Sequence, residues 1–317
     1  MPGVDVAIPC FQQGRFLRQC VESVLSQGIG DLRILIIDNA STDGSAEIAR
    51  RLATENRNVE VSLHKANLGP HASFNEGVDW ARADYFMVLC ADDLLGPGSL
   101  AAMLAILEEN LDATFAYGRD AHWYEGAPQP VVATVGDFAP WCLRDGHDFV
   151  FERCRNPEHY IAAGMVLVRT SAQKAAGHYR DTLPHTDDFE MLLRLACLGR
   201  VADTQAVVGI KRMHDYNRTK EFLAERTRDL VERQAALESF FAREGSALPD
   251  AARLLRLGSR SIAERAYWCA VKDAVHGRFR AAGELFSLAY RLSPRVVLLP
   301  PFNYLWRMER SLLQSIR

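Results

Sequence analysis

The sequence has few cysteines, and they do not come in pairs. Seven are spread over 317 residues, and no two of them form a C-x-x-C motif. An odd number of scattered thiols fits reduced cysteines better than a disulfide framework or a cysteine-based zinc site. We expect most of them to be small core residues.

The chain also lacks an excess of one charge. Its 37 Lys and Arg residues stand against 40 Asp and Glu residues, which gives a net charge of -3, and no long run of bases occurs. A protein without a global positive field has nothing to attract the phosphate backbone of a nucleic acid. We therefore expect no nucleic-acid partner.

Long hydrophobic runs are absent as well. No segment approaches the ~20 apolar residues of a membrane span, and Met1 to Asp5 have neither the basic start nor the apolar stretch of a leader peptide. We expect a cytoplasmic protein. Residues 296–302, followed by the bases Arg307 and Arg310, allow two interpretations. They pack against the protein's own helices, or they make a peripheral contact with the inner face of the membrane.

What the sequence does contain is a regular alternation of apolar runs and helical periodicity over its first 120 residues. The predicted strands are Val4–Pro9, Leu32–Ile37, Val59–Leu63 and Tyr85–Leu89. The predicted helices are Arg15–Gln27, Ser45–Glu55, His71–Ala81 and Ser99–Glu109. This alternation predicts an α/β fold with a largely parallel sheet and helices on both faces.

The pattern changes after this region. From Arg119 to Tyr160 the periodicity is lost, and we expect an irregular polar and aromatic loop. Regular elements then return, and we expect them at Ile161–Val168, Ser171–Ala176, Asp188–Leu198 and Val201–Met213. Beyond Thr219 the chain is predicted to be helical, over Glu221–Arg243, Pro249–His276 and Arg278–Leu292, with a helical hairpin around Gly277. The predicted domains are therefore 1–219 and a helical region, 220–317.

Three polar segments follow predicted strands. Ligands of such sheets bind beyond the carboxyl ends of the strands, so we expect Pro9–Gln12, Asp38–Asp43 and the pair Asp92-Asp93 to share one edge. Two carboxylates at a strand end favour a hard divalent cation such as Mg²⁺ or Mn²⁺, with water or substrate phosphates as further ligands. The alternative is a solvated Asp-Asp turn.

Residues 8–12, 21–27 and 36–44 resemble the opening of family 2 glycosyltransferases. The resemblance implies a GT-A fold, a Rossmann-like nucleotide-binding sheet flanked by helices, here with a C-terminal helical extension. It implies that the first and second loops grip the base of a nucleotide through Pro9, Phe11, Asp38 and Asn39. Where the family often has two acids, this chain has Asp38-Asn39. Because an amide both donates and accepts hydrogen bonds, the identity of the base stays open.

Two further segments continue the resemblance. Asn67-Leu68-Gly69 looks like the family's Asn-x-Gly element near the diphosphate, and the alternative is a turn before a helix. Cys90-Ala91-Asp92-Asp93 stands at the family's Asp-x-Asp motif, with Cys90 in place of the first acid. The resemblance implies that Asp92 and Asp93 hold the cation and that Asp92 contacts the donor. It does not decide which of the two is the direct ligand.

The second half of the chain supplies the implied chemistry. Thr186-Asp187-Asp188 resembles the family's acidic helix start, and Asp188 matches the catalytic base. A helix N-terminus keeps such a carboxylate ionised, although Asp187 and Asp188 could instead only cap the helix. Residues 211–219 resemble the closing element of the family, which implies His214 as a metal ligand and Arg212 or Lys211 at the diphosphate. A structural role for His214 is the alternative.

The implied function is an inverting, metal-dependent glycosyltransferase. It would move a sugar from a UDP- or dTDP-type donor to a glycan or lipid-linked acceptor, in bacterial surface polysaccharide or glycolipid synthesis. Residues 1–118 would bind the donor, and residues 119–219 would bind the acceptor and carry out catalysis. A sugar-phosphate nucleotidyltransferase would need a Gly-rich basic loop after the first strand, where this chain offers only Gly14 and Arg15. The alternative is a non-catalytic nucleotide- or glycan-binding scaffold, which Cys90 and the helical tail favour and which Asp92, Asp188 and His214 disfavour.

Overall fold

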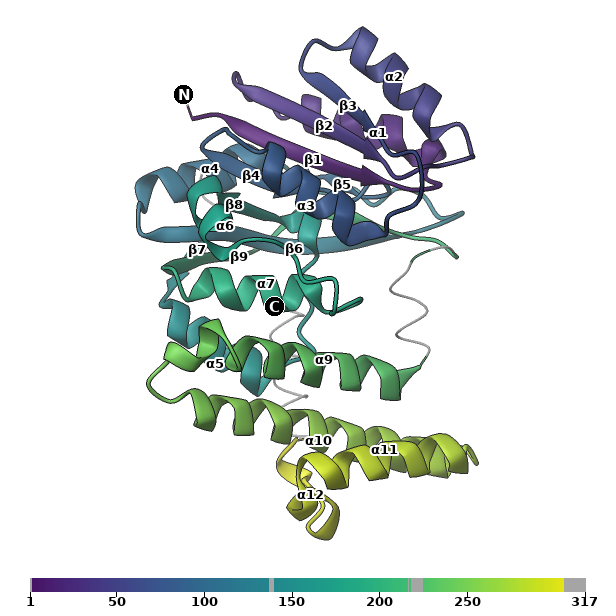
Figure 1. The fold of residues 1–317 in the computed structure, drawn as a ribbon, viewed down its shortest axis with the longest axis vertical. Coiled ribbons are helices and arrows are strands. Elements are labelled where there is room, and N and C mark those ends of the chain that lie inside the picture. Colours follow the sequence, from purple (N-terminus) through teal and green to yellow (C-terminus); the bar gives the residue numbers. More distant parts are fainter. Residues whose placement is uncertain (1, 137–139, 216, 218–224, 305–317) are drawn as a thin grey trace. The chain divides into compact units, whose positions relative to one another are not determined.

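The computed structural model describes residues 2–136, 140–215, 217 and 225–304 (Figure 1). The chain forms two compact units. The first comprises residues 1–149, 161–182 and 187–215, and the second comprises residues 150–160, 183–186 and 216–317. Within the described part of the chain, none of the helices has both the length and the apolar character needed to cross a bilayer.

The first unit is built on a mixed sheet. Its strands are β1 (Val4–Cys10), β2 (Leu32–Asp38), β3 (Val59–Leu63), β4 (Tyr85–Val88), β5 (Leu94–Leu95), β6 (Ala113–Tyr124), β7 (Trp141–Arg144), β8 (Val166–Arg169) and β9 (Arg200–Met213). Its helices are α1 (Gly14–Leu25), α2 (Ser45–Glu55), α3 (Pro70–Trp80), α4 (Ser99–Glu109), the short η1 (Ala163–Met165), α6 (Thr170–Ala176) and α7 (Asp187–Ala196). Helix α5 (Gly146–Arg155) begins in this unit and ends in the second.

The strand order is β3-β2-β1-β4-β8-β6-β9-β5, and β7 pairs with β9 beside this path. The strands β3, β2, β1 and β4 are parallel to one another. Strand β8 runs antiparallel to both β4 and β6, whereas β6 and β9 are parallel. The predicted parallel sheet is thus confirmed for the first four strands, and the remainder of the sheet is mixed.

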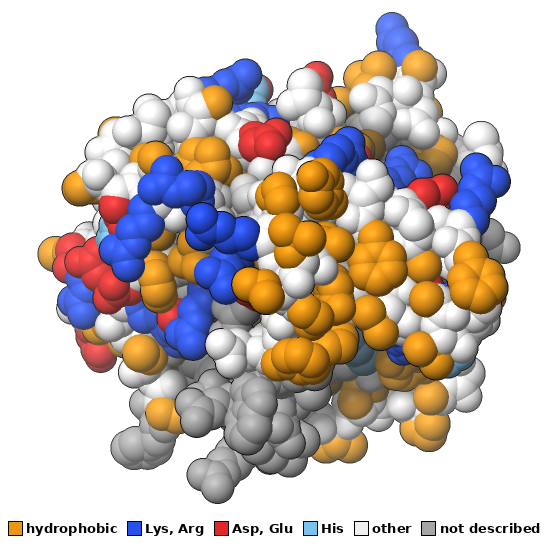
Figure 2. Space-filling model, turned by 90° about the horizontal axis from the view of Figure 1, so that it is seen from below, with side chains coloured by type: hydrophobic (Ala, Val, Ile, Leu, Met, Phe, Trp, Pro, Cys, Tyr) orange, Lys and Arg blue, Asp and Glu red, His pale blue; other side chains and the backbone are white. Residues whose placement is uncertain are grey.

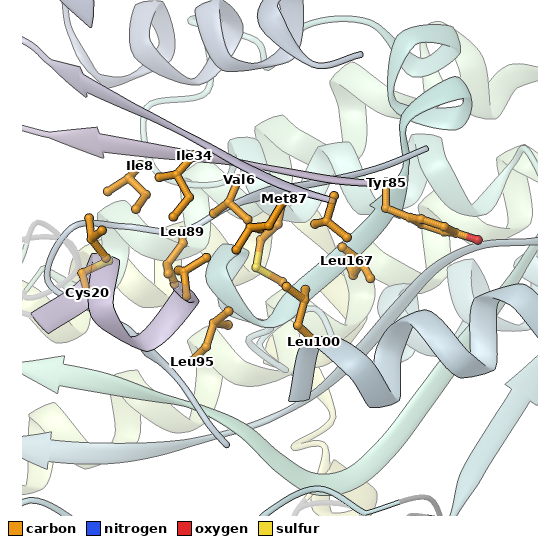
Figure 3. Packing of buried hydrophobic residues seen from close by; sticks show 14 of the residues in the cluster. Val6, Ile8, Cys20, Ile34, Tyr85, Met87, Leu89, Leu95, Leu100 and Leu167 are labelled. Atoms are coloured by element: carbon orange, nitrogen blue, oxygen red, sulfur yellow. The ribbon is translucent and has the colours of Figure 1, made fainter. Parts of the chain in front are cut away.

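Alternating side chains of the central strands point to opposite faces of the sheet. On one face Val6, Ile8, Ile34 and Met87 pack under α1, α2 and α4, as Figure 3 shows for part of this cluster. On the other face a smaller cluster contacts α3, and it consists of Ala7, Leu35, Ile37, Val78, Ala81, Phe86 and Val88. The predicted placement of helices on both faces is therefore confirmed.

One glycine permits the close packing of α3. A Cβ atom on Gly77 would lie 2.5 Å from the Cβ of Ala7 in β1, closer than real Cβ contacts allow. Glycine at this position lets the helix backbone approach the sheet. The position of α3 matters because its first turn follows the loop that carries Asn67 and Gly69.

The expectation of an irregular loop between Arg119 and Tyr160 is confirmed only for its middle, where residues 125–136 form no helix or strand, and is wrong for the segments on either side. Strand β6 continues to Tyr124 beside β9, and β7 and α5 follow. The far half of β6 is only partly buried, and its register against β9 shifts around Arg119. Its polar and aromatic side chains therefore show no apolar alternation, and pairing with β9 imposes a strand that the residue pattern does not indicate.

The second unit is helical. Its main elements are α9 (Arg226–Phe241), η2 (Glu244–Ala247), α10 (Ala251–Val275), α11 (Phe279–Leu292) and α12 (Pro294–Leu298). The predicted hairpin is confirmed, because Gly277 has φ +74° and ends α10. Its N–H bonds to the carbonyl of Ala274, and the N–H of Arg278 bonds to that of Asp273, which is the Schellman arrangement. The predicted helix start at Glu221 and the boundary at Thr219 lie outside the described residues.

Candidate active site

The loops after β1 and β2 are held together by reciprocal hydrogen bonds. The Gln12 N–H donates to Ser41 Oγ at 2.9 Å, and the Thr42 N–H donates to Gln12 Oε1 at 3.2 Å. Gln12 and Ala40 have positive φ values, 56° and 62°. Residues other than glycine rarely adopt this backbone conformation, and it is found preferentially at functional sites. The first and second loops of the predicted nucleotide site are therefore linked to each other by hydrogen bonds.

Asp38 ends β2 at the second of these loops and is 2% exposed. Its Oδ1 accepts a hydrogen bond from the Ser41 N–H at 3.0 Å. Its Oδ2 is buried and has no hydrogen-bond partner in the described part of the chain. A buried carboxylate oxygen without a partner is costly unless a ligand satisfies it. Phe11 is 43% exposed beside the same loop and offers a ring face to a ligand.

Asn39 is surrounded by partners from the protein itself. Its Nδ2 donates to Asn67 Oδ1 and to the Gly69 carbonyl, both at 3.0 Å. Its Oδ1 accepts from the Leu68 N–H at 2.9 Å and lies 2.8 Å from Nδ1 of His64. Two donors and two acceptor positions are all that an amide has. The structure thus brings Asn39 together with Asn67 and Gly69, and the whole Asn39 side chain is used to hold the loop.

His64 and Glu76 extend this network and were not predicted from the sequence. Nε2 of His64 lies 2.5 Å from Oε2 of Glu76 on α3, while Nδ1 faces Asn39. The orientation of Asn39 is fixed by its backbone partners, so His64 Nδ1 must be the donor to Oδ1. No spacing or motif links His64 to Glu76, since the two residues come from different elements.

The acid pair after β4 is buried beside the end of β9. Asp92 and Asp93 are 7% and 6% exposed. Nε2 of His214 lies 3.1 Å from Oδ2 of Asp92, and the Arg212 N–H donates to Oδ1 of Asp93 at 3.0 Å. The predicted ligands Asp92 and His214 are therefore adjacent, although they are 122 residues apart in the chain.

The two carboxylates of this site suit a hard divalent cation, whereas a thiol such as Cys90 suits softer metals. Ligand atoms of Cys90, Asp92 and Asp93 all lie within 4.8 Å of one another, and the imidazole of His214 contacts Asp92. Burial, and then the neighbouring charge of Asp92, raise the pKa of Asp93 well above its usual range. Two buried carboxylates repel each other, and a bound cation would offset that repulsion. Carboxylate oxygens with one imidazole suit Mn²⁺ or Mg²⁺.

The guanidinium of Arg212 is fixed between two aromatic rings. Its central carbon lies 4.4 Å from the ring centre of Phe16 and 4.1 Å from that of Trp123. Nε donates to the Asp92 carbonyl and Nη2 to Gln19. These contacts bind the acid pair to α1. Lys211, on the opposite face of β9, lowers the pKa values of Asp93 and Cys90 through its charge, against the larger effect of burial.

Asp187 and Asp188 begin α7. Asp188 is half-buried, and its Oδ1 accepts from the Phe189 N–H at 2.6 Å. Its charge reaches Cys90, where it adds to the effects of burial and the acid pair in raising the thiol pKa. Asp187 is buried, with Oδ2 3.2 Å from Nε2 of His71, outside hydrogen-bond geometry. The predicted base therefore lies within electrostatic reach of the predicted metal site.

A buried ion cluster fixes α7 in place. Glu190 is fully buried and accepts hydrogen bonds from Arg180 and from Nε of Arg194 at 3.0 Å. Arg194 also donates to the carbonyls of Ala176 and His178. A buried carboxylate is tolerated when its lone pairs are satisfied in this way. The cluster holds the start of α7, and with it Asp188, against the preceding loop.

A sheet of this order with flanking helices and acids at its strand ends defines a GT-A fold. The model of the family described as glycosyl transferase family 2 matches residues 5–172, which is more than half of the chain. The chain belongs to glycosyl transferase family 2 and is classed with the glycosyltransferases.

Similar proteins come from several bacteria. The chain is 28% identical over 197 residues to the uncharacterized glycosyltransferase YibD of Escherichia coli K12, covering 59% of this chain and 56% of that protein. It is 32% identical over 219 residues to the chondroitin synthase of Pasteurella multocida, covering 68% of this chain and 21% of that protein. The matches thus span about half or less of these relatives.

Two solved structures share the fold. TarS 1-349 of S. aureus in complex with UDP-GlcNAc has a TM-score of 0.57 at 13% identity, covering 92% of this chain and 90% of that one. The mannosyltransferase PcManGT of Pyrobaculum calidifontis, in complex with GDP-Man and Mn²⁺, has a TM-score of 0.56 at 14% identity, covering 95% and 88%. At such identities the likeness establishes the fold alone.

Proposed function

We propose that this chain transfers a sugar from a nucleotide diphosphate sugar of the UDP or dTDP type to an acceptor hydroxyl, with inversion at the anomeric carbon. The observation that carries the proposal is the position of Asp188. Its carboxylate is half-buried at the start of α7 and lines a small cavity with Val88, the last residue of β4, which lies just before the Cys90–Asp93 segment. Family membership and the nucleotide sugars bound to two proteins of the same fold support it.

In this proposal Asp188 accepts the proton of the acceptor hydroxyl as its oxygen attacks the anomeric carbon. The bond from that carbon to the phosphate oxygen breaks, and the nucleoside diphosphate leaves. Asp92, Asp93 and His214 would hold Mn²⁺ or Mg²⁺, which offsets the charge of the diphosphate when it is bound. Asp38, Phe11 and Pro9 fix the base, so that the sugar is aligned for attack. Asn67, Gly69 and Arg212 or Lys211 serve the diphosphate side.

The proposed biological role is the synthesis of a bacterial surface polysaccharide or glycolipid. The sequence similarity between this chain and part of a chondroitin synthase supports this role. The acceptor would be a glycan or a lipid-linked glycan on the cytoplasmic side of the membrane. The predicted peripheral membrane contact falls partly on residues 305–317, which lie outside the described residues.

The test is turnover with a panel of nucleotide sugars and Mn²⁺, following release of nucleoside diphosphate. We expect slow release from one donor, and we expect EDTA to abolish it. The Asp188→Asn variant should lose about 100- to 10,000-fold in rate, whereas Asp181→Asn, a change of an exposed acid on the loop before α7, should keep it. Unchanged turnover in Asp188→Asn would exclude this residue as the base. No release or binding of any donor, even with glycan acceptors present, would favour a non-catalytic scaffold.

A further inference from the structure

The helices α10 to α12 carry a charge that the rest of the chain does not. Residues 251–304 contain nine Lys and Arg against three Asp and Glu, a net charge of +6, although the whole chain carries -3. The excess is therefore local to the helical unit. A local excess of bases indicates an anionic partner for this unit. The net charge of the whole chain gives no such indication.

The few acids of these helices contribute little to the surface. Glu264 and Asp273 are buried, and each is paired with an arginine, Arg260 and Arg278 respectively. Several bases remain exposed, and the side chain of Arg280 is 95% exposed. These two pairs remove equal numbers of acids and bases, so the net charge of +6 is carried by the remaining bases.

Exposed apolar side chains accompany these bases. Leu298 and Leu299, at the end of α12, are 73% and 74% exposed, and Phe302 is 61% exposed. The ring of Phe302 lies 5.7 Å from that of Trp268 in α10, which holds the segment against the helix. Figure 2, which views the molecule from below, shows Lys and Arg side chains gathered beside a stretch of hydrophobic side chains.

We propose that this basic-apolar surface, formed by the exposed bases of α10 to α12 with Leu298, Leu299 and Phe302, binds an anionic lipid membrane. Bases next to a membrane are attracted by its negative surface potential, and exposed leucine and phenylalanine side chains enter the boundary between head groups and acyl chains. A nucleic acid would use the bases but would leave the leucines exposed. The combination therefore favours a membrane over a nucleic acid.

This inference rests on the proposed function and extends it, because a membrane-binding surface would bring the enzyme to a lipid-linked acceptor. Vesicle binding needs neither donor nor turnover, so it can fail while the proposed glycosyl transfer succeeds, and the reverse also holds.

The experiment is co-sedimentation of the full chain with vesicles of phosphatidylcholine alone and with added phosphatidylglycerol. We expect binding only to the anionic vesicles and its loss at high salt. The combined change Arg253→Gln, Arg280→Gln and Arg295→Gln should weaken binding by about 100-fold, or about fivefold for each base. Leu298→Ser with Leu299→Ser should weaken it by at least about tenfold.

Matched variants in the first unit serve as controls. Arg51→Gln removes an exposed base, and Leu111→Ser removes a leucine that is 77% exposed; neither should change vesicle binding. Equal binding to both kinds of vesicle would overturn the role of the bases. Binding to single-stranded RNA that the arginine changes abolish, with no binding to vesicles, would assign the surface to a nucleic acid and overturn the proposal.

Discussion

The two units of this protein use charge in opposite ways. At the strand ends of the first unit, Asp38, Asp92 and Asp93 are buried, and two of them lie side by side. On α10 to α12 of the helical unit several bases are exposed, while Glu264 and Asp273 are buried and paired. Burying like charges costs free energy. A fold tolerates that cost where a bound ligand offsets it. Exposed bases cost little and act over a distance of about 10 Å. One arrangement suits chemistry, and the other suits docking.

The largest effect on ligand binding should come from removing one buried acid of the strand-end site. Asp92→Asn loses a carboxylate and its contact with His214, so we expect Mn²⁺ affinity to fall by about 100-fold or more, measured by calorimetry. Vesicle binding by the same variant should be unchanged. Asp112→Asn, which alters an exposed acid before β6, is the control. Mn²⁺ affinity equal to that of the unchanged protein would show that Asp92 is not a ligand.

Removing the carboxylate that supports α7 should cost stability. Glu190→Gln leaves Arg180 and Arg194 buried without their counter-charge, so the free energy of unfolding should fall by about 3–5 kcal/mol, measured with urea. Glu284→Gln, on the exposed side of α11, breaks a surface pair with Arg280 and should cost at most about 1 kcal/mol. Similar losses in both variants would contradict the structural role of the Glu190 cluster.

A smaller effect on binding is expected at Asn39. Whether donor affinity falls equally for all bases matters more than how far it falls. Asn39→Asp restores the acid that the family often has, but it places a carboxylate oxygen against Asn67 Oδ1 and the Gly69 carbonyl. We expect donor affinity to fall by about 10- to 100-fold, equally for uridine, guanosine and thymidine diphosphates. Asn56→Asp, which alters a similar amide–carbonyl contact after α2, should leave affinity unchanged. A change in preference between bases would instead show that Asn39 contacts the base.

The smallest effect concerns a paired acid of the helical unit. Burial opposes ionisation of Asp229, but its hydrogen bond with His185 and the charge of Arg233 outweigh burial and lower its pKa. A lowered pKa stabilises the fold above the unfolded value of about 4, and that stability is lost as pH falls through the folded pKa. Asp229→Asn should therefore cost about 1–3 kcal/mol at neutral pH. The difference should shrink below about pH 4 in urea unfolding, and a pH-independent difference would contradict this account.

Much of the first unit could be predicted from the sequence because its elements have strong periods. The bounds of α2, β3 and α4 agree with those expected from the residues. The far half of β6 could not be predicted, since its pattern is that of a partly exposed strand whose pairing depends on β9.

The candidate site divides in the same way. Resemblance indicated Asp92 and His214, and the fold places them in contact; their roles stay predictions. Tyr216, Arg218 and Thr219 of the same element lie outside the described residues. The contacts of Asn39 with His64, and of His64 with Glu76, depend on how three segments meet in space. A list of residues cannot indicate that an amide has already used all its hydrogen bonds.

The loops that contain Gln12 and Ala40, both with positive φ values, should open and close together. Gln12 and the Ser41-Thr42 segment that follows Ala40 exchange hydrogen bonds in both directions, so a movement of either loop breaks contacts with the other. The two loops should open together in one cooperative event, and the Gln12 and Thr42 amides should exchange their hydrogens at one common rate. Two clearly different rates would show that the loops move separately. Where they do open together, a donor meets a base pocket that is either assembled or absent, with no partly formed state between.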